Sequence, residues 1–261
     1  MNLRLVSIAL LTVALAACGN RAQVPDAPRA GVIAPNFGDT DRRDFPGRQP
    51  RSYPVQGIDA SRYQGAIDWR SAAAAGVSFA YLKATEGGDG LDPTFAANWQ
   101  GAAKAGIPRG AFHFFYWCRP AAEQARWFIR NVPRSQGALP PVLDLEWTPF
   151  SPTCTLRPGG AKVRAEALIF VNALERHYGQ RPLIYTTPEI YADAQLGRIA
   201  GYEFWLRSTA DRPSATYPGQ AWTFWQYSGT GLVPGIRGKT DLNAFAGSPA
   251  DWANWLSSRA R

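Results

Sequence analysis

The sequence predicts an α/β fold: an irregular, TIM-like βα barrel of about eight strands from which some helices are missing. From residue 53 onward, short apolar runs alternate with helical patterns, which is typical of a mostly parallel sheet. Toward the C-terminus the apolar runs follow one another with few helices between them, so the barrel is expected to be irregular. No repeat of fixed period divides the chain, and residues 53–261 are therefore predicted to form one domain.

Eight strands are predicted from short apolar runs bounded by turn residues. The first four runs each precede a helical pattern, as expected for βα units: residues 55–59, 77–84, 109–116 and 141–146. The remaining four complete the barrel: residues 182–186, 203–206, 222–227 and 236–242.

Five helices are predicted from their start and stop signals. Asp68 caps the first helix and Gly76 follows it, while Pro93 and Gly106 bracket the second. The fourth helix is the longest, carries an apolar stripe on one face, and ends at Gly179. The predicted ranges are residues 68–75, 93–105, 121–131, 161–178 and 251–258.

The extreme N-terminus, residues 1–17, is typical of a secretory signal peptide. Arg4 precedes an apolar run that is too short to span a bilayer. The junction Leu15-Ala-Ala-Cys18-Gly resembles a bacterial lipobox, in which the cysteine is acylated and becomes the first residue of the mature protein. The alternative is an ordinary small-residue cleavage site that contains a cysteine. Glycine rather than aspartate after Cys18 favours the outer membrane in a cell with two membranes.

Residues 18–52 are expected to form a disordered tether. The segment is rich in proline and arginine, which break regular elements, and it shows no hydrophobic periodicity. Such a tether would hold the domain away from the membrane.

The three cysteines fit an oxidising compartment. If Cys18 carries lipid, Cys118 and Cys154 remain as an even pair, and a disulfide between them is the natural expectation. Two buried free thiols are the alternative.

Composition and charge exclude several classes of protein. Of 261 residues, 46% are hydrophobic and 18% are charged, which rules out fibrous, wholly disordered and multi-span membrane chains. The net charge of +8 suits anionic partners such as cell-wall polymers or membrane surfaces. The basic residues form no stripe in the sequence, so nucleic acid is not an expected partner.

Polar side chains gather at the carboxyl ends of the predicted strands. In a βα barrel these ends form one rim, where active sites lie. A strand-end carboxylate that merely caps the next helix is the alternative for any one of them. The residues are Asp59, Glu86, His113, Asp144, Glu146, Tyr185, Gln226 and Asp241.

The pair Asp144 and Glu146 is the sharpest feature of this set. Residues i and i+2 of a strand point to the same face, so both carboxyl groups are expected at the barrel mouth. Two close carboxylates raise at least one pKa, as a general acid near neutral pH requires. Glycoside hydrolysis uses such a pair. An ion pair with arginine or a metal site is the alternative, although two histidines without ligand spacing argue against a metal.

Seven blocks of sequence, in order, together resemble the glycoside hydrolase family 25 muramidases, and Asp241-Leu-Asn243 matches that family's closing aspartate. The resemblance spans about residues 55–246 and implies a flattened, irregular βα barrel. It also implies cleavage of the β-1,4 bond between N-acetylmuramic acid and N-acetylglucosamine in peptidoglycan. The blocks are Gly57-Ile-Asp59-Ala-Ser61, Tyr81-Leu-Lys83-Ala-Thr-Glu86-Gly, Gly110-Ala-Phe112-His113-Phe114, Val142-Leu-Asp144-Leu-Glu146, Ile184-Tyr185-Thr, Phe204-Trp205 and Trp225-Gln226-Tyr227-Ser.

The resemblance implies a role for each matched residue. Glu146 would be the general acid and base, and Asp144 would orient or stabilise the substrate's acetamido group. Direct attack of water with inversion is the alternative route. Asp59 and Asp241 would tune the charge of the pair. The substrate-binding residues would be Tyr185, Trp205 and Tyr116 as sugar platforms, or as core aromatics without that role, together with His113, Lys83 and Gln226.

Two departures from the family pattern are visible. Phe112 replaces the tyrosine that often precedes the histidine of the third strand, and Leu206-Arg207 replaces Ile-Ala after the tryptophan of the sixth. Neither change touches the carboxylates.

Three other functions would each require sequence features that differ from those present. A chitinase-like barrel would require aspartates where Leu139 and Val142 stand, and a lytic transglycosylase normally has an unrelated helical fold. A non-catalytic, lipid-anchored peptidoglycan-binding protein would be expected to lack the acid, and Glu146 is present. The expectation is a monomeric enzyme without cofactors or metal. It would be anchored by lipid in the cell envelope, at the outer membrane and facing the periplasm, and would act on glycan strands.

Overall fold

The computed structural model describes residues 31–259. The predicted signal peptide and Cys18 lie outside these residues. The strands are β1 (Gly38–Asp39), β2 (Gln56–Ala60), β3 (Phe79–Glu86), β4 (Gly90–Leu91), β5 (Arg109–Phe114), β6 (Val142–Leu145), β7 (Leu183–Thr186), β8 (Glu203–Arg207), β9 (Phe224–Leu232) and β10 (Thr240–Phe245). The helices are α1 (Trp69–Ala74), α2 (Phe95–Lys104), α3 (Ala121–Asn131), α4 (Gly160–Tyr178), α5 (Pro188–Ala194), α6 (Pro213–Thr216) and α7 (Pro249–Arg259), with short 3-10 turns at Pro50–Ser52 and Leu196–Arg198.

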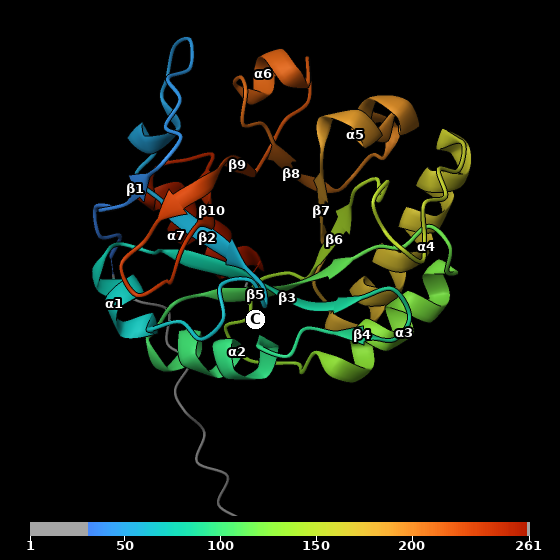
Figure 1. Ribbon diagram of the computed structural model, residues 1–261, viewed down its shortest axis with the longest axis horizontal. Helices are drawn as coiled ribbons and strands as arrows, with labels where there is room; N and C mark the ends of the chain where they lie inside the picture. The colour runs from blue at the N-terminus through green and yellow to red at the C-terminus, as the bar shows by residue number, and fades with distance from the viewer. Residues whose placement is uncertain (1–30, 260–261) are drawn as a thin grey trace, which may run out of the picture.

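Eight of the strands close into a barrel, which confirms the predicted fold class (Figure 1). Strands β2, β3, β5, β6, β7, β8 and β9 pair in parallel, each with the next. Strand β10 closes the ring by pairing antiparallel with both β9 and β2. This closing pair sets Asp241 directly opposite Asp59, so two predicted site residues from the ends of the domain become neighbours.

Strand alternation sorts the side chains into two cores. Large rings such as Tyr81, Trp205 and Phe224 fill the barrel interior, and a second core lies between the barrel and its outer helices. On β6, Leu143 and Leu145 belong to the outer core, so the alternate residue Asp144 faces the interior. The barrel interior below Asp144 is therefore apolar, and the polar residues concentrate at its mouth.

Residues 31–52 are ordered and pack on the barrel, so the predicted disordered tether over residues 18–52 is wrong for this part of the chain. Strand β1 pairs antiparallel with β9, and Asn36 donates a main-chain hydrogen bond of 2.8 Å to Ala75. Phe45 is buried, and its ring lies 5.1 Å from that of Trp225. Isolated apolar residues among prolines give no periodic signal, yet one buried aromatic ring is enough to hold an irregular segment against the barrel. The ordered domain thus begins well before residue 53.

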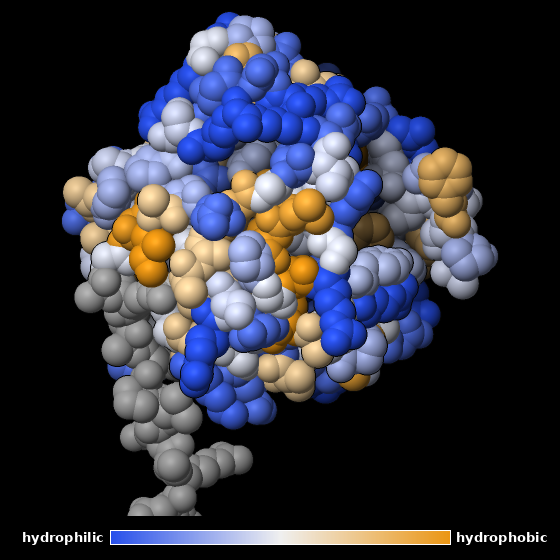
Figure 2. All heavy atoms as spheres, turned by 60° about the vertical axis from the view of Figure 1, so that its left-hand side comes forward, coloured by the Kyte–Doolittle hydropathy of each residue, from blue (hydrophilic) through white to orange (hydrophobic). Residues whose placement is uncertain are grey.

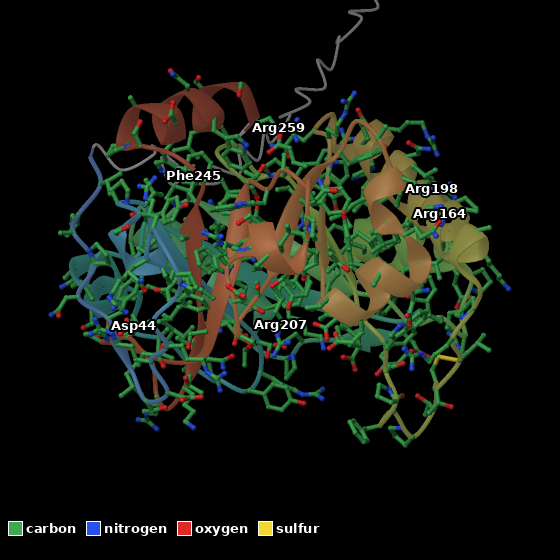
Figure 3. The ribbon with its side chains drawn as sticks, turned by 90° about the horizontal axis from the view of Figure 1, so that it is seen from above. Asp44, Arg164, Arg198, Arg207, Phe245 and Arg259 are labelled. Atoms are coloured by element: carbon green, nitrogen blue, oxygen red, sulfur yellow. A yellow bond between two sulfur atoms is a disulfide. The ribbon has the colours of Figure 1, made fainter. Side chains whose placement is uncertain are left out.

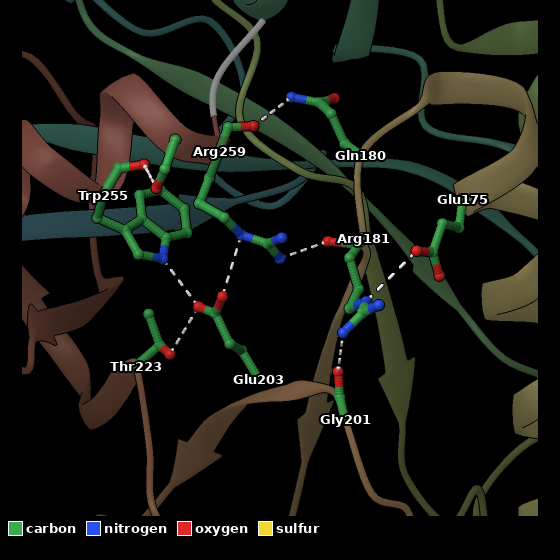
Figure 4. A network of polar contacts seen from close by, with 9 residues as sticks. Glu175, Gln180, Arg181, Gly201, Glu203, Thr223, Trp255 and Arg259 are labelled. Carbon is green, nitrogen blue, oxygen red and sulfur yellow. Dashed lines mark hydrogen bonds and ion pairs between the residues drawn. The ribbon is translucent and has the colours of Figure 1, made fainter.

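Helix α7 seals the end of the barrel opposite the site through the polar network of Figure 4. Glu203, at the start of β8, accepts hydrogen bonds of 2.8 Å from Trp255 and from Thr223. Its second oxygen lies 3.0 Å from Nε of Arg259. The same carboxylate therefore joins two barrel strands to the last helix.

A disulfide joins Cys118 to Cys154, as the cysteine count predicted. The two cysteines follow β5 and β6, and their Cα atoms lie 5.7 Å apart. The bond is visible in yellow in Figure 3, beside the loops at the carboxyl ends of the strands.

The surface of residues 31–259 is mostly polar on the face shown in Figure 2. Smaller hydrophobic groups lie between the hydrophilic side chains of this face. No helix among the described residues has the length and hydropathy needed to cross a bilayer.

Candidate active site

A pocket opens at the carboxyl ends of the barrel strands, where the sequence places its polar residues. It contains four carboxyl groups, which come from three segments of the chain: Asp59 on β2, Asp144 and Glu146 at the end of β6, and Asp241 on β10. Around them stand two cations, aromatic rings and short polar groups: Ser61, Tyr63, Gln64, Lys83, Phe112, Phe114, Tyr185, Trp205, Arg207 and Gln226.

Asp144 is buried at the end of β6 and is poised to accept a hydrogen bond. It is only 5% exposed, and its Oδ1 has no hydrogen-bond partner among the described residues. Burial, followed by the charge of Glu146, raises the pKa of Asp144 well above its usual value, while Lys83 opposes this effect. An acceptor buried without a partner costs free energy, so this oxygen marks a point where a substrate donor would be favoured.

Glu146 follows Asp144 by two residues and carries the second carboxyl group of the pair. Burial raises its pKa, and the charge of Asp59 adds to this, while the charge of Arg207 and the polar hydroxyl of Tyr185 act in the opposite direction. The Trp117 indole donates a hydrogen bond of 2.9 Å to the Glu146 carbonyl and thereby fixes the main chain. A pocket carboxyl group whose pKa is raised in this way is suited to general acid catalysis.

A chain of hydrogen bonds fixes Asp59 at the floor of the pocket. The Tyr185 hydroxyl donates to Gln226 at 2.8 Å, and the Gln226 amide donates to Asp59 at 3.0 Å. Asn243 donates to the same carboxylate oxygen at 2.7 Å and accepts 2.8 Å from the Trp205 indole. Five buried side chains thus hold one another in a single arrangement, which pre-organises the site.

Asp241 faces Asp59 across the β2–β10 pair, and the two carboxyl groups share a hydrogen bond. Burial and the charge of Asp59 raise the pKa of Asp241 well above its usual value. The pKa of Asp59 rises less, because amide donors stabilise its charged form. Burial and the charge of Asp59 thus favour the protonated form of Asp241, whereas the amide donors favour the charged form of Asp59.

Three predicted substrate-binding residues need correction. His113 is fully buried behind β5, where its ring nitrogens lie 2.7 Å from Thr85 and 3.0 Å from Gln124, and burial lowers its pKa to about 3. It points to the outer helices because it alternates with the inward-facing Phe112. Trp205 lines the pocket but is only 2% exposed, too little for a sugar platform.

Tyr116 does not line the pocket; its ring packs edge-on against Phe114, which does. Tyr185 and Gln226 line the pocket as predicted, although Tyr185, at 5% exposure, offers a hydroxyl rather than an open ring face. Lys83 also lines it, paired with Glu86 and 4.7 Å from the Phe114 ring centre.

Two residues of the site, Asn243 and Tyr63, were not among the site residues predicted from the sequence. Asn243 is a partner of Asp59, and the i, i+2 spacing from Asp241 on one strand is a signal that could have identified it. Tyr63, 77% exposed at the pocket rim, offers the open aromatic face that Trp205 lacks, and no pattern in its surrounding loop distinguishes it.

No group of three or more histidine, cysteine or acidic side chains within residues 31–259 is arranged to hold a metal ion. Among the acidic groups of the pocket, Asp59 accepts hydrogen bonds from the amides of Gln226 and Asn243.

Comparisons with known proteins agree with this arrangement. The family model described as glycosyl hydrolases family 25 matches residues 58–236. Lysozyme M1 of Streptomyces globisporus is 38% identical over 211 residues, which cover 75% of this chain and 69% of that protein. The uncharacterized protein YegX of Escherichia coli is 34% identical over 265 residues and covers 95% of this chain and 94% of its own.

Solved structures give the same result. A bacterial lysozyme from Streptomyces coelicolor superposes with a TM-score of 0.70 at 36% identity, covering 79% of this chain and 98% of that one. A family 25 glycosyl hydrolase from Bacillus anthracis gives 0.69 at 35% identity, with 77% and 93% covered. Barrel topology, carboxylate placement and sequence similarity thus coincide, and the chain belongs to glycosyl hydrolases family 25.

Proposed function

We propose that the protein is a muramidase that hydrolyses the β-1,4 bond between N-acetylmuramic acid and N-acetylglucosamine in peptidoglycan. The observation that carries the proposal is the buried pair Asp144 and Glu146, with raised pKa values, at the mouth of a family 25 barrel. Its relatives include Lysozyme M1 and the N,O-diacetylmuramidase of Arthroderma benhamiae, which is 34% identical over 142 residues.

The two carboxyl groups divide the chemistry between them. Glu146 gives its proton to the glycosidic oxygen as the bond to the anomeric carbon breaks. The acetamido oxygen of the substrate attacks that carbon, while Asp144 accepts a hydrogen bond from the acetamido N–H through its unpartnered Oδ1. Water then attacks the resulting oxazolinium, and Glu146 takes up the proton that water loses.

The anomeric form of the fresh product tests this route. Attack by the acetamido group followed by water retains the β configuration, whereas direct attack by water inverts it. Proton NMR of the first-formed reducing ends is expected to show the β anomer. An initial α anomer would mean that Asp144 instead assists a water molecule.

Digestion of purified peptidoglycan tests the activity itself. Mass spectrometry is expected to show fragments with reducing muramic ends, whereas 1,6-anhydro ends would indicate a transglycosylase. Glu146→Gln keeps the shape of the side chain but removes its proton, so cleavage should fall by about 10²- to 10⁴-fold. If the wild-type chain binds peptidoglycan and releases no fragments, it is a binding protein rather than an enzyme.

We further propose that Cys18 carries a lipid anchor after removal of residues 1–17. The junction before Cys18 supports this, and a signal peptide agrees with the Cys118–Cys154 disulfide, which needs an oxidising compartment. The protein would then be a monomer in the cell envelope, at the outer membrane and facing the periplasm. Wild-type protein is expected in the membrane fraction, and Cys18→Ser is expected to lose its lipid. A Cys18→Ser protein that still bears lipid would contradict the assignment.

A further inference from the structure

Arg207 is a cation in the pocket without an acidic partner. It ends β8, two residues after Trp205, and lines the pocket together with Glu146 and Asp241. Figure 3 labels its position in the barrel. Its main-chain carbonyl accepts a hydrogen bond from the Tyr217 hydroxyl. Within residues 31–259, its guanidinium makes no hydrogen bond, and no carboxylate oxygen lies within ion-pair distance of it.

Lys83, the other cation that lines the pocket, shows the contrast. Its ammonium group pairs with the Glu86 carboxylate and lies over the ring of Phe114. The charge of Lys83 is thus satisfied by the protein, whereas the partly buried guanidinium of Arg207 faces the pocket with its donors unused.

The charge of Arg207 opposes the chemistry assigned to Glu146. It lowers the pKa of Glu146 and that of Asp241, and so weakens the hold of Glu146 on the proton it must donate. An anionic group that enters with the substrate and pairs with Arg207 would remove this opposition. Glu146 would then hold its proton most firmly when the anionic substrate is bound.

We propose that Arg207 binds a carboxylate of the substrate, and that this carboxylate is the free lactyl group of N-acetylmuramic acid in glycan strands that have lost their stem peptides. The inference rests on the proposed muramidase activity. A guanidinium presents a planar fork of donors that matches a carboxylate. The lactyl group hangs on the sugar by a short ether and enters the pocket with the ring, whereas the carboxylates of a stem peptide lie at least one residue farther out.

This assignment places the enzyme in a reaction sequence. In intact peptidoglycan the lactyl carboxyl group is bound in an amide to the stem peptide and carries no charge. A hydrolysis of that amide must therefore supply the preferred substrate.

The experiment compares substrates that differ in one charge per disaccharide. Intact glycan strands, strands stripped of peptides by an amidase, and stripped strands whose carboxyl groups are converted to methylamides are each digested by the full chain. A fourth substrate, intact strands with amidated peptide carboxyl groups, reports on the peptide as the source of the carboxylate. The measured quantity is kcat/KM for the release of reducing ends.

Three variants accompany the wild-type protein. Arg207→Ala removes the guanidinium, and Arg207→Lys keeps the charge but loses the fork. Arg126→Ala removes an equal charge from the exposed face of α3, where Arg126 does not line the pocket, and controls for the attraction of a polyanion to a basic protein.

Wild-type protein is expected to cleave stripped strands about 10-fold or more faster than their methylamides, as expected for a charge-assisted contact. Arg207→Ala should bring this ratio near one, Arg207→Lys should keep part of it, and Arg126→Ala should keep it whole.

Other outcomes overturn the inference in recognisable ways. A wild-type ratio near one, or a ratio that survives in Arg207→Ala, shows that Arg207 does not bind the lactyl group. A preference for intact strands that is lost on amidation of the peptide assigns the carboxylate to the stem instead. If wild-type protein cleaves none of the four substrates, the muramidase proposal itself fails.

Discussion

The pKa of Glu146 is set in part by one negatively charged neighbour, Asp59, and one positively charged neighbour, Arg207. Burial and the charge of Asp59 raise its pKa, while the charge of Arg207 and the polar hydroxyl of Tyr185 lower it. Because Glu146 must be protonated in order to donate, the alkaline limb of kcat/KM against pH reports its pKa in the free enzyme. Each neighbour therefore has a signed effect on the pH range of activity.

Two substitutions should move the alkaline limb in opposite directions. Arg207→Ala removes a charge that lowers the pKa of Glu146, so the limb should move to higher pH. Asp59→Asn removes a charge that raises it, so the limb should move to lower pH, while the new side chain keeps an oxygen that Asn243 and Gln226 can reach. Profiles are measured on methylamide strands, so that no substrate carboxylate contributes.

Arg126→Ala serves as the control and should leave the limb in place. Shifts of the same sign for Arg207→Ala and Asp59→Asn would show that another group governs the alkaline limb.

Strand alternation explains which site residues could be predicted. Asp144 and Glu146 share one face by their i, i+2 spacing, and the structure places both in the pocket. His113 stands at the same rim but on the opposite face of its strand, and a strand covered on both sides is too apolar throughout to reveal which face looks inward. The free guanidinium of Arg207 depends on distances to distant segments, which sequence does not provide.

At the level of elements, His113 ties β5 to its neighbours. It links Thr85 of β3 to Gln124 of α3 and stacks on Phe170 of α4, with ring centres 4.9 Å apart. Burial lowers its pKa to about 3, so the folded protein keeps it neutral while the unfolded chain protonates it near its usual value of 6.5. Its contribution to stability is complete above pH 6.5 and is lost as the pH falls toward 3.

We predict that His113→Gln loses this acid sensitivity. In the wild-type protein the free energy of unfolding should drop, through this residue, by roughly 1.4 kcal/mol per pH unit below 6.5. Urea unfolding at pH 7 and pH 5 should therefore show a larger loss for the wild type than for His113→Gln. Equal losses in the two proteins would mean that His113 is not held neutral.

The Cys118–Cys154 bond spans 36 residues and includes β6 between its ends. Closing a loop of this length should stabilise the fold by about 4 kcal/mol in the chain-entropy model. The double variant Cys118→Ala/Cys154→Ala should be less stable by up to this amount in urea, and reducing agent should lower the stability of the wild type alone. A double variant as stable as the oxidised wild type would show that the bond adds nothing.

Elements with terminal signals were predicted closely, and those without were not. Helix α1 begins after its cap Asp68, whose side chain accepts from two main-chain N–H groups, and α4 ends at Gly179 with a φ of 65°. The short helix α5 has only seven residues, too few for a periodic pattern to be seen. Strand β10 begins at Thr240 rather than at residue 236, because the preceding loop turns at Gly235 and Gly238, both at positive φ.

For the molecule as a whole, Glu203 connects the base of the barrel to α7 (Figure 4). Its carboxylate holds Thr223, Trp255 and Arg259 together, and it is partly buried. Glu203→Ala should therefore lower the free energy of unfolding by about 1–3 kcal/mol, because three partly buried donors lose their acceptor.

Glu175 provides a matched control at the outer edge of the same network. It pairs with Arg181 at 3.3 Å on the surface, and such pairs contribute about 0–1 kcal/mol. Thermal unfolding should rank wild type and Glu175→Ala close together and Glu203→Ala clearly below them. A Glu203→Ala protein as stable as Glu175→Ala would show that α7 is held by its apolar contacts alone.

The overall barrel followed from the βα alternation, but its manner of closure did not. A short apolar run does not reveal whether its strand will pair parallel or antiparallel with its neighbours. The antiparallel pairing of β10 with β2 and β9 is therefore known only from the closed barrel. The packing of residues 31–52 escaped prediction for a related reason, since it depends on a surface formed by β9 and α1.

Barrel closure also sets the point in folding at which the floor of the active site becomes complete. Asp59 and its partner Asn243 are separated by 184 positions and meet only when the first and last barrel strands pair. A chain still being synthesised, or one cut before β10, holds Asp144 and Glu146 but has no finished floor beneath them. We therefore expect a chain truncated before β10 to lack an ordered Asp59 and to leave peptidoglycan uncut.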